Sequence, residues 1–216
     1  MSLLPETTTP TQNGRTSHRF FANYYERTSR SSGEERFMKP LRQEVTGLAH
    51  GRVLEIGAGN GLNFAFYRPE MVERVEAIEP DRVMLGHARK RAEAAPVLIN
   101  LVQAPVENLP FPDESFESAV ATLVFCSVDD PPRGLREVRR VLKPGGLLLM
   151  VEHVRARGGI TATMQDIVTP ITRLVIGNCH WNRDTEKTVL EAGFKIEQRR
   201  DLTWSMLPFV VLHAIK

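Results

Sequence analysis

A glycine-rich segment at residues 53–61 limits the folds open to this chain more than any other part of it. Residues 53–56 form a short apolar run interrupted only by Glu55, which is typical of a buried strand in a parallel sheet. Glycines follow at positions 57, 59 and 61, and residues 62–67 can start a helix. A strand, a glycine turn and a helix bring backbone N–H groups close to a ligand, because a side chain would fill the space that the ligand needs.

The spacing of these glycines argues against a dinucleotide-binding loop. In that loop the third glycine comes three residues after the second, where helix and strand pack closely. Leu62 stands at that position here, and Gly61 comes one residue earlier. Glu79 ends a second apolar strand, expected at residues 75–79, and an acid at this place can accept hydrogen bonds from both hydroxyls of a ribose. The alternative is an ordinary glycine turn and an unrelated surface acid.

The composition excludes several classes of protein. With 216 residues, 42% of them apolar, the chain is long enough for one domain with a substantial core. The net charge of +2 gives no reason to expect nucleic acid as a partner. We find no signal-peptide pattern and no apolar run long enough to span a bilayer, so we expect a cytoplasmic protein without a transmembrane anchor. Cys126 and Cys179 are far apart and lack metal-ligand spacing, so we expect neither a disulfide framework nor a metal site.

Strand-like and helix-like segments alternate along the chain. This alternation predicts an α/β fold with a doubly wound, mostly parallel seven-stranded sheet and an antiparallel edge strand from the final pair. Pro40 marks either the start of a helix or a kink in it, and Asp184 or Thr185 caps the last helix, which ends at Gly193. The strands are expected at residues 53–56, 75–79, 98–102, 116–125, 147–152, 194–199 and 208–215, and the helices at 34–48, 80–95, 135–142, 164–176 and 184–193.

Four stretches of the sequence, the glycine loop among them, resemble those of a known family. The glycine loop, the sequence Ile78, Glu79 and Pro80, and residues 108–111 and 141–146 resemble class I S-adenosylmethionine-dependent methyltransferases. Within that class they are similar to the branch holding the ubiquinone and menaquinone C-methyltransferases. Residues 122–128, 152–154 and 178–185 are more narrowly similar to the methyltransferase-like alkyl thiol S-methyltransferases of animals. The resemblance runs from about Arg36 to the end of the chain and implies a Rossmann-like methyltransferase fold.

The resemblance implies a cofactor site for S-adenosylmethionine, which leaves as S-adenosylhomocysteine. The glycine loop would approach the methionine part, Glu79 and Pro80 the ribose, and residues 105–107 the adenine ring. Pro105 departs from the family, since many relatives carry an acid or Asn there, and this leaves backbone atoms or a water to meet the adenine amine. The expected cofactor residues are Glu55, Gly57, Ala58, Gly59, Asn60, Gly61, Glu79, Pro80, Pro105, Val106, Glu107, Thr122 and Leu123.

The family also implies a small, lipophilic methyl acceptor. The favoured acceptor is a thiol, with S-methylation as the reaction. The alternative is C- or O-methylation of a quinone-like or other secondary metabolite. Ligands of doubly wound sheets lie beyond the carboxyl ends of the strands, which points to the tips of two strands and to the apolar segment after them. The expected acceptor pocket comprises Tyr24, Phe125, Cys126, Ile171, Leu174, His180 and Trp181.

His153, at the tip of a strand, is the candidate base for this reaction; otherwise it is a histidine hydrogen-bonded to the backbone. Cys126 is more easily explained as a small buried residue than as a nucleophile. Residues 179–181 either close the acceptor pocket or form the packed start of the next helix. Tyr24 and Tyr25 either line the pocket or pack on the edge of the sheet.

These expectations divide the chain into functional regions. Residues 1–17, rich in Thr and Pro, form a disordered arm, and residues 18–216 form a single methyltransferase domain. Within it, residues 18–48 make an N-terminal helical cap and residues 154–182 an insertion on the acceptor side. The protein is expected to be a monomer or a homodimer. Two rival classes are a nicotinamide-dependent oxidoreductase, disfavoured by Leu62, and a non-catalytic cofactor-binding protein.

Overall fold

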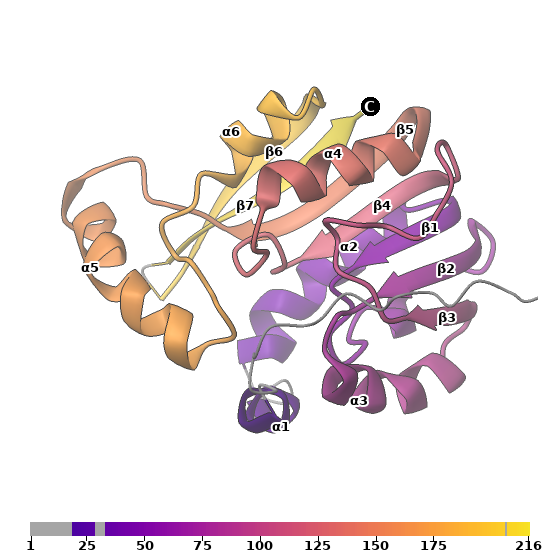
Figure 1. The fold of residues 1–216 in the computed structure, drawn as a ribbon, viewed down its shortest axis with the longest axis horizontal. Helices are drawn as coiled ribbons and strands as arrows, with labels where there is room; N and C mark the ends of the chain where they lie inside the picture. Colours follow the sequence, from indigo (N-terminus) through magenta and orange to yellow (C-terminus); the bar gives the residue numbers. More distant parts are fainter. Residues whose placement is uncertain (1–18, 29–32, 206) are drawn as a thin grey trace, which may run out of the picture.

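A seven-stranded sheet with the strand order β3-β2-β1-β4-β5-β7-β6 forms the centre of the computed structural model (Figure 1). The structure describes residues 19–28, 33–205 and 207–216, so the arm expected at residues 1–17 lies outside the described residues. The strands are β1 (Gly51–Ile56), β2 (Val72–Ile78), β3 (Leu98–Val102), β4 (Phe116–Thr122), β5 (Leu142–His153), β6 (Lys195–Trp204) and β7 (Leu207–Ile215).

Strands β1 to β5 pair in parallel, which confirms the expected fold class. Strand β7 runs antiparallel to both β5 and β6 and lies between them, so β6 is the edge strand. Only two residues separate β6 from β7, and so short a connection requires an antiparallel hairpin. The antiparallel strand therefore lies one place inside the edge of the sheet.

Helices pack on both faces of the sheet, and each face has its own hydrophobic core. Leu54 and Ile56 of β1 face one core, together with Leu135 of α4, while Val53 faces the other core with Val45 of α2. This two-sided burial explains why the strands are nearly continuous apolar runs. The α-helices are α1 (Arg19–Thr28), α2 (Lys39–Leu48), α3 (Arg82–Glu93), α4 (Pro131–Val141), α5 (Gly159–Val175) and α6 (Thr185–Glu191); a π-helix precedes α2 at Glu34–Met38.

None of the helices in the described ranges combines the length and the apolarity needed to cross a bilayer.

Two local expectations fail at the ends of strands. The helix expected after the glycine loop is reduced to one 3-10 turn, Phe64–Phe66, because Pro69 lacks a backbone N–H and the chain must reach β2 at Val72. Strand β4 ends at Thr122 instead of Phe125, because Leu123 adopts a left-handed backbone conformation with φ of 58°. The chain turns there, and the ring of Phe125 enters the core.

The carboxyl ends of the parallel strands meet at one edge of the sheet. This edge gathers the glycine loop after β1, Glu79 after β2, Leu123 after β4 and His153 at the end of β5. Segments far apart in the sequence thereby form one site, at the edge where ligands bind in doubly wound sheets.

Candidate active site

A cavity of about 470 Å³ opens at the carboxyl edge of the sheet. Most of the residues expected at the cofactor or acceptor site line it. These are Glu55, Gly57, Ala58, Gly59, Asn60, Glu79, Pro80, Pro105, Val106, Glu107, Thr122, Leu123, Cys126, His153 and Trp181.

Six of the expected residues do not line this cavity. Gly61 lies beneath the loop, where an added Cβ would come 2.6 Å from the ring of Phe64. Tyr24 is 65% exposed, whereas its neighbour Tyr25 lines the cavity, since successive residues of a helix point in different directions. The others outside the cavity are Phe125, which is buried in the core, His180, which is half-buried, and the exposed residues Ile171 and Leu174 of α5.

The glycine loop offers its backbone to the cavity. Gly57 and Gly59 have φ angles of 59° and 57°, in the left-handed region that favours glycine. A Cβ on Gly57 would lie 2.7 Å from the side chain of Val124, whereas a Cβ on Gly59 would meet no atom closer than 4.0 Å. Gly57 is therefore required for packing as well as for its φ angle, and the space beside Gly59 is open.

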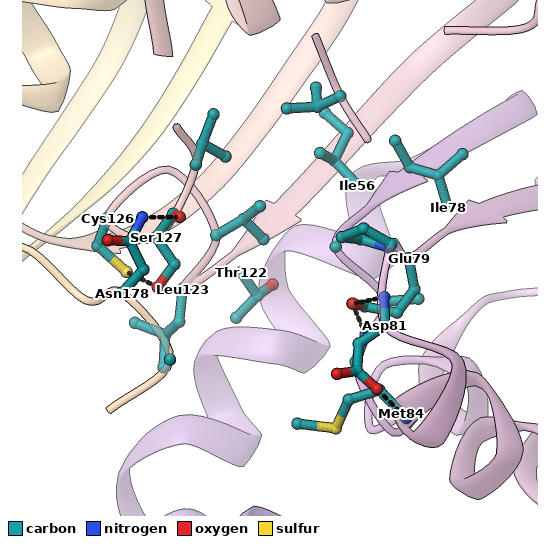
Figure 2. A pocket seen from close by; sticks show the side chains of 18 of the residues that line it. Ile56, Ile78, Glu79, Asp81, Met84, Thr122, Leu123, Cys126, Ser127 and Asn178 are labelled. Atoms are coloured by element: carbon teal, nitrogen blue, oxygen red, sulfur yellow. Dashed lines mark hydrogen bonds between the residues drawn. The ribbon is translucent and has the colours of Figure 1, made fainter. Parts of the chain in front are cut away.

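Glu79 forms the wall next to this loop (Figure 2). Its Oε2 accepts a hydrogen bond from Gly59 N at 2.9 Å, and its Oε1 accepts one from Asp81 N at 2.9 Å. Burial raises the pKa of this carboxyl group, while the two backbone donors act in the opposite direction. Since each carboxylate oxygen can accept a second bond, Glu79 can receive two hydroxyl groups of a ligand.

A buried cation lies under the same cavity. Arg42 is only 4% exposed; its Nε donates to Glu34 Oε1 at 2.6 Å and its Nη1 to Asn63 Oδ1 at 3.0 Å. Its Nη2 has no hydrogen-bond partner among the described residues, although Arg42 lines the cavity. A buried guanidinium with an unused donor is suited to a carboxylate of a ligand.

Glu55 is the second buried charge beneath the cavity. It accepts a hydrogen bond from Tyr67 Oη at 2.7 Å, and burial raises its pKa to about 7 although Tyr67, Arg42 and Asn63 favour the ionised form. Sequence reasoning missed Arg42 and Asn63, whereas Tyr25 lines the cavity, which was one of its two expected alternatives. Arg42 stands three residues before the apolar Val45, on the same side of the expected helix, and this position was a usable signal for its burial.

The first helix is fastened to the glycine loop. Asn60 Nδ2 donates to Glu26 Oε2 at 2.6 Å, and the guanidinium of Arg91 contacts both Glu26 oxygens at 2.9 Å. Arg91 Nη1 also donates to Asn60 O at 2.9 Å. Helix α1 is therefore held against both α3 and the loop, next to the cavity that Tyr25 lines.

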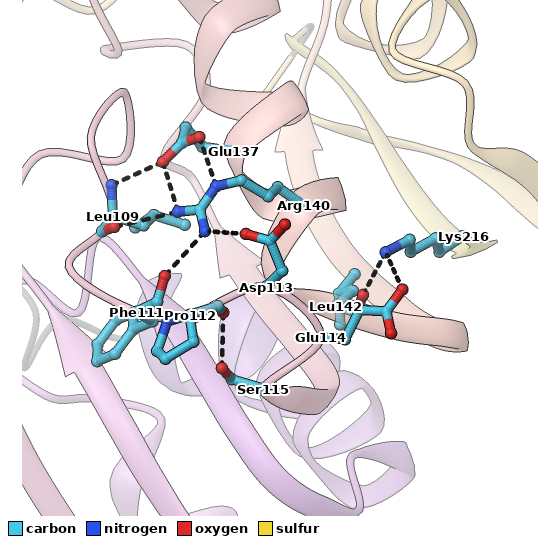
Figure 3. Close-up of polar contacts among 10 residues, drawn as sticks. All are labelled: Leu109, Phe111, Pro112, Asp113, Glu114, Ser115, Glu137, Arg140, Leu142 and Lys216. Atoms are coloured by element: carbon cyan, nitrogen blue, oxygen red, sulfur yellow. Dashed lines mark hydrogen bonds and ion pairs between the residues drawn. The ribbon is translucent and has the colours of Figure 1, made fainter.

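A second clamp holds residues 109–113, which continue the chain from the cavity wall at residues 104–107. Arg140 of α4 donates to Leu109 O at 3.1 Å, to Phe111 O at 2.9 Å and to Asp113 Oδ1 at 2.7 Å (Figure 3). Glu137 pairs with the same guanidinium and accepts a hydrogen bond from Leu109 N at 3.0 Å. These bonds satisfy the backbone of a connection without regular structure and keep its beginning at the cavity.

The opposite wall carries two thiols and an imidazole. In Figure 2, Cys126, Ser127 and Asn178 lie across from Glu79, Asp81 and Met84, with Thr122 between the two groups. His153 Nε2 lies 2.9 Å from Cys179 Sγ, and ligand atoms of Cys126, His153 and Cys179 all lie within 4.8 Å of one another. All three residues are buried and line the cavity. We refer to Cys126, His153 and Cys179 as the thiol–imidazole cluster.

The cluster shifts the ionisation of its members. The hydrogen bond with Cys179 lowers the pKa of Cys126 well below its usual value, burial opposes this, and His153 adds to it. The same hydrogen bond raises the pKa of Cys179. Burial, together with the charge of Cys126, raises the pKa of Glu152 to about 8. The shifts are opposite in direction because the two thiols lie close together beside the cavity.

Comparison with known proteins shows the family. Residues 54–150 match the sequence family described as "Methyltransferase domain". The chain is 37% identical over 176 residues to the thiol S-methyltransferase TMT1B of Rattus norvegicus, covering 80% of this chain and 68% of that protein. The chain belongs to the class I S-adenosylmethionine-dependent methyltransferases. A second relative of this methyltransferase is human TMT1B, 36% identical over 191 residues, with 82% of this chain and 78% of that protein covered.

Other relatives and solved structures agree with this family. The demethylmenaquinone methyltransferase of Deinococcus radiodurans is 34% identical over 140 residues, covering 61% of this methyltransferase and 58% of that protein. A putative methyltransferase of Bacillus halodurans superposes with a TM-score of 0.69 over 83% of this chain and 98% of its own; at 17% identity it supports the fold alone. These findings support a methyltransferase and not the two rival classes, a nicotinamide-dependent oxidoreductase and a non-catalytic cofactor-binding protein.

The cavity of the methyltransferase fits S-adenosylmethionine, the cofactor of this family. The fit rests on the unused Nη2 of Arg42 for the carboxylate, the open space at Gly59 and the free acceptor capacity of Glu79 for the ribose. Residues 104–107 of the fixed connection complete the side of the cavity next to Glu79. The cavity thus offers a complementary group for the carboxylate and one for the ribose of the cofactor.

Proposed function

We propose that this methyltransferase methylates the sulfur of a small, lipophilic thiol. The observation that carries the proposal is the thiol–imidazole cluster on the wall opposite Glu79. Apolar side chains line the same cavity, among them Val124, Val128 and Ile176, and they suit an uncharged acceptor. The thiol S-methyltransferases named among the relatives support the same acceptor atom.

When bound, S-adenosylmethionine supplies a methyl group on a sulfonium. The acceptor nucleophile attacks the methyl carbon in line with the sulfur that leaves. The chain's main task is to hold the two reactants in one line, and positioning of this kind contributes about 7–11 kcal/mol. We infer that Arg42 holds the carboxylate end of the cofactor and Glu79 its ribose. The tip at Leu123, whose left-handed φ of 58° holds the backbone in a strained turn, would separate the cofactor side from the acceptor side.

The contacts of His153 support a role within the thiol–imidazole cluster better than a role as a free base. Its Nε2 is engaged with Cys179 Sγ at 2.9 Å, and its Nδ1 is buried with no partner among the described residues. A free base needs a nitrogen within hydrogen-bond reach of the acceptor's proton. We therefore propose that His153 assists the acceptor together with the two cysteines. Residues 154–182, which carry Cys179, would form the acceptor side and residues 18–48 the cap.

The proposal is tested with acceptors that differ in one atom. An alkane thiol and the alcohol of the same chain length share shape and lipophilicity, but the thiol is by far the stronger acid and its sulfur the better nucleophile. With S-adenosylmethionine as donor, we expect methylated thiol as product, measured by mass spectrometry, and no methylated alcohol.

A quinol with an alkyl tail is the third acceptor in this comparison. Turnover of the quinol with none of the thiol would replace S-methylation by C- or O-methylation of a quinone-like molecule. Turnover of the thiol at a rate equal to the reaction without enzyme would also refute the proposal. Binding of S-adenosylmethionine, followed by calorimetry, controls for a correctly folded protein in each case.

A further inference from the structure

We propose that Cys126, His153 and Cys179 bind a zinc ion whose fourth position receives the sulfur of the acceptor. The inference deepens the proposed function and rests on it for the identity of the acceptor. It goes against the expectation from sequence, which found no metal-ligand spacing. The three ligands come from three separate places: the turn after β4, the end of β5 and the connection after α5.

The distances within the cluster match a tetrahedral zinc site. Zinc binds Cys sulfur at about 2.3 Å and His nitrogen at about 2.0–2.1 Å, which sets neighbouring ligand atoms roughly 3.5–3.8 Å apart. The ligand atoms here lie within 4.8 Å of one another, and the closest pair, His153 Nε2 and Cys179 Sγ, is 2.9 Å apart. Tetrahedral spacing therefore requires this pair to separate by about 0.6 Å and any pair at the 4.8 Å limit to close by about 1 Å.

Hydrogen bonds outside the cluster hold its two cysteines in place. The residue after Cys179 donates its backbone N–H to Cys126 O at 2.8 Å, and Asn178 Nδ2 donates to Ser127 O at 3.0 Å. Arg183 Nη1 donates to the carbonyls of Phe125 and Val128 at 2.5 and 2.6 Å. The two segments that carry the thiols are thus joined to each other by their own contacts, so the site is formed before a metal binds.

Glu152 fixes the turn that carries Cys126 relative to His153. Its Oε1 accepts hydrogen bonds from Val124 N at 2.8 Å and Phe125 N at 3.0 Å. These bonds tie the turn that carries Cys126 to the end of β5, where His153 is the next residue. All three ligands are therefore set on the sheet or fastened to it.

The kinds of ligand select the metal and its role. Two thiolates and one imidazole are soft or borderline donors, which suit zinc and not magnesium or calcium. A set of two Cys and one His with one open position is a known form of catalytic zinc site, whereas structural sites use four protein ligands. Because all three residues line the cavity, the open position faces the space proposed for the acceptor.

The reaction balances without a further reagent. The acceptor thiol gives its proton to water and its sulfur takes the open position on the zinc as a thiolate. A sulfur electron pair then forms the new carbon–sulfur bond, while the old bond of the methyl group breaks and its electrons return to the sulfonium. The products are the methyl thioether, neutral S-adenosylhomocysteine and one proton.

The first test is the metal content of the purified full-length protein. Elemental analysis, after incubation with zinc and removal of free metal, is expected to give about one zinc per chain. Cys126→Ser and Cys179→Ser should each weaken zinc binding on the order of tenfold or more. His87→Ala is the matched control, because His87 lies on α3 outside the cavity and contacts Asn23, and it should retain the zinc. Calorimetry with S-adenosylmethionine confirms that each variant is folded.

The second test asks whether the acceptor reaches the metal. Cobalt replaces zinc as a spectroscopic probe, and an alkane thiol should strengthen its thiolate-to-metal absorption, whereas the matched alcohol should not. Absence of bound zinc in protein that binds S-adenosylmethionine would overturn the site. An unchanged cobalt spectrum with thiol would overturn the open position. Thiol methylation that is equally fast without metal would refute the inference and leave the proposed function standing, whereas bound zinc with no thiol turnover would refute the proposed function alone.

Discussion

Replacing Gly57 with valine is expected to abolish binding of S-adenosylmethionine. Gly57 has a φ of 59°, and its Cβ position lies 2.7 Å from the side chain of Val124. A β-branched residue there is strained in its backbone, by about 1–2 kcal/mol, and must also displace Val124, which itself lines the cavity. The loop then moves away from the position at which its backbone can approach the cofactor. Calorimetry with the cofactor measures the loss.

Gly86→Ala is the control for this substitution. Gly86 lies in α3, and a Cβ there would meet no atom within 4 Å. Alanine in a helix is favoured over glycine by roughly 0.5–1 kcal/mol, so this variant should bind the cofactor normally and unfold at a slightly higher temperature. If Gly57→Val bound the cofactor as tightly as Gly86→Ala does, the glycine loop would be only a structural turn and would not bind the cofactor.

Glu79→Ala is expected to weaken binding of S-adenosylmethionine by about 1.5–3 kcal/mol, or roughly 10- to 150-fold. The carboxylate orders Gly59 N and Asp81 N, each at 2.9 Å, and has acceptor capacity left for the ribose. Alanine removes both effects at once. Titration calorimetry gives the affinity, and a thermal unfolding curve shows whether the fold is kept.

Glu76→Ala is the matched control, since Glu76 lies on β2, the strand that Glu79 directly follows, and does not line the cavity. Its carboxylate contacts Asn100 and Arg74, both at 3.3 Å. The variant should keep the affinity of the unaltered protein for the cofactor. Equal affinities for the Glu79 and Glu76 variants would mean that Glu79 does not contact the ribose.

The fold and the cofactor side followed from the sequence because they depend on local patterns. Short apolar runs gave the strands, and the right-handed crossovers of a doubly wound sheet leave few other arrangements for them. Once the strands were ordered, their carboxyl ends had to meet. The glycine loop and Glu79, each directly after a strand, were therefore placed at one cavity.

The acceptor side depends on which face of a helix is turned inward, and periodicity does not tell this. Helix α5 exposes its apolar residues and buries polar ones: Gln165 Nε2 donates to Val154 O at 3.0 Å, and Thr172 Oγ1 to Cys179 O at 2.8 Å. The buried face is polar because it hydrogen-bonds the irregular backbone around it. Ile171 and Leu174 are thus 61% and 81% exposed, away from the cavity.

The thiol–imidazole cluster was also beyond local patterns. Its three members are separated by long stretches of chain, and only the pairing of β4 with β5 and the backbone contacts after α5 bring them together. Each member lay in one of the stretches that resemble thiol S-methyltransferases. The sequence predicted a common pocket for these segments, but it did not predict that two thiols and an imidazole lie within 4.8 Å of one another, since a resemblance in separate stretches says nothing about distance.

A crystal structure with S-adenosylhomocysteine tests the account most directly, because it shows the orientation of the ligand in the cavity. We predict that the ribose hydroxyls contact Glu79, that the carboxylate contacts Arg42 Nη2, and that the ligand's sulfur faces Cys126. In that orientation the methyl group of the cofactor points at the thiol–imidazole cluster. A ligand with its adenine ring beside Cys126, or one bound outside this cavity, would contradict the account.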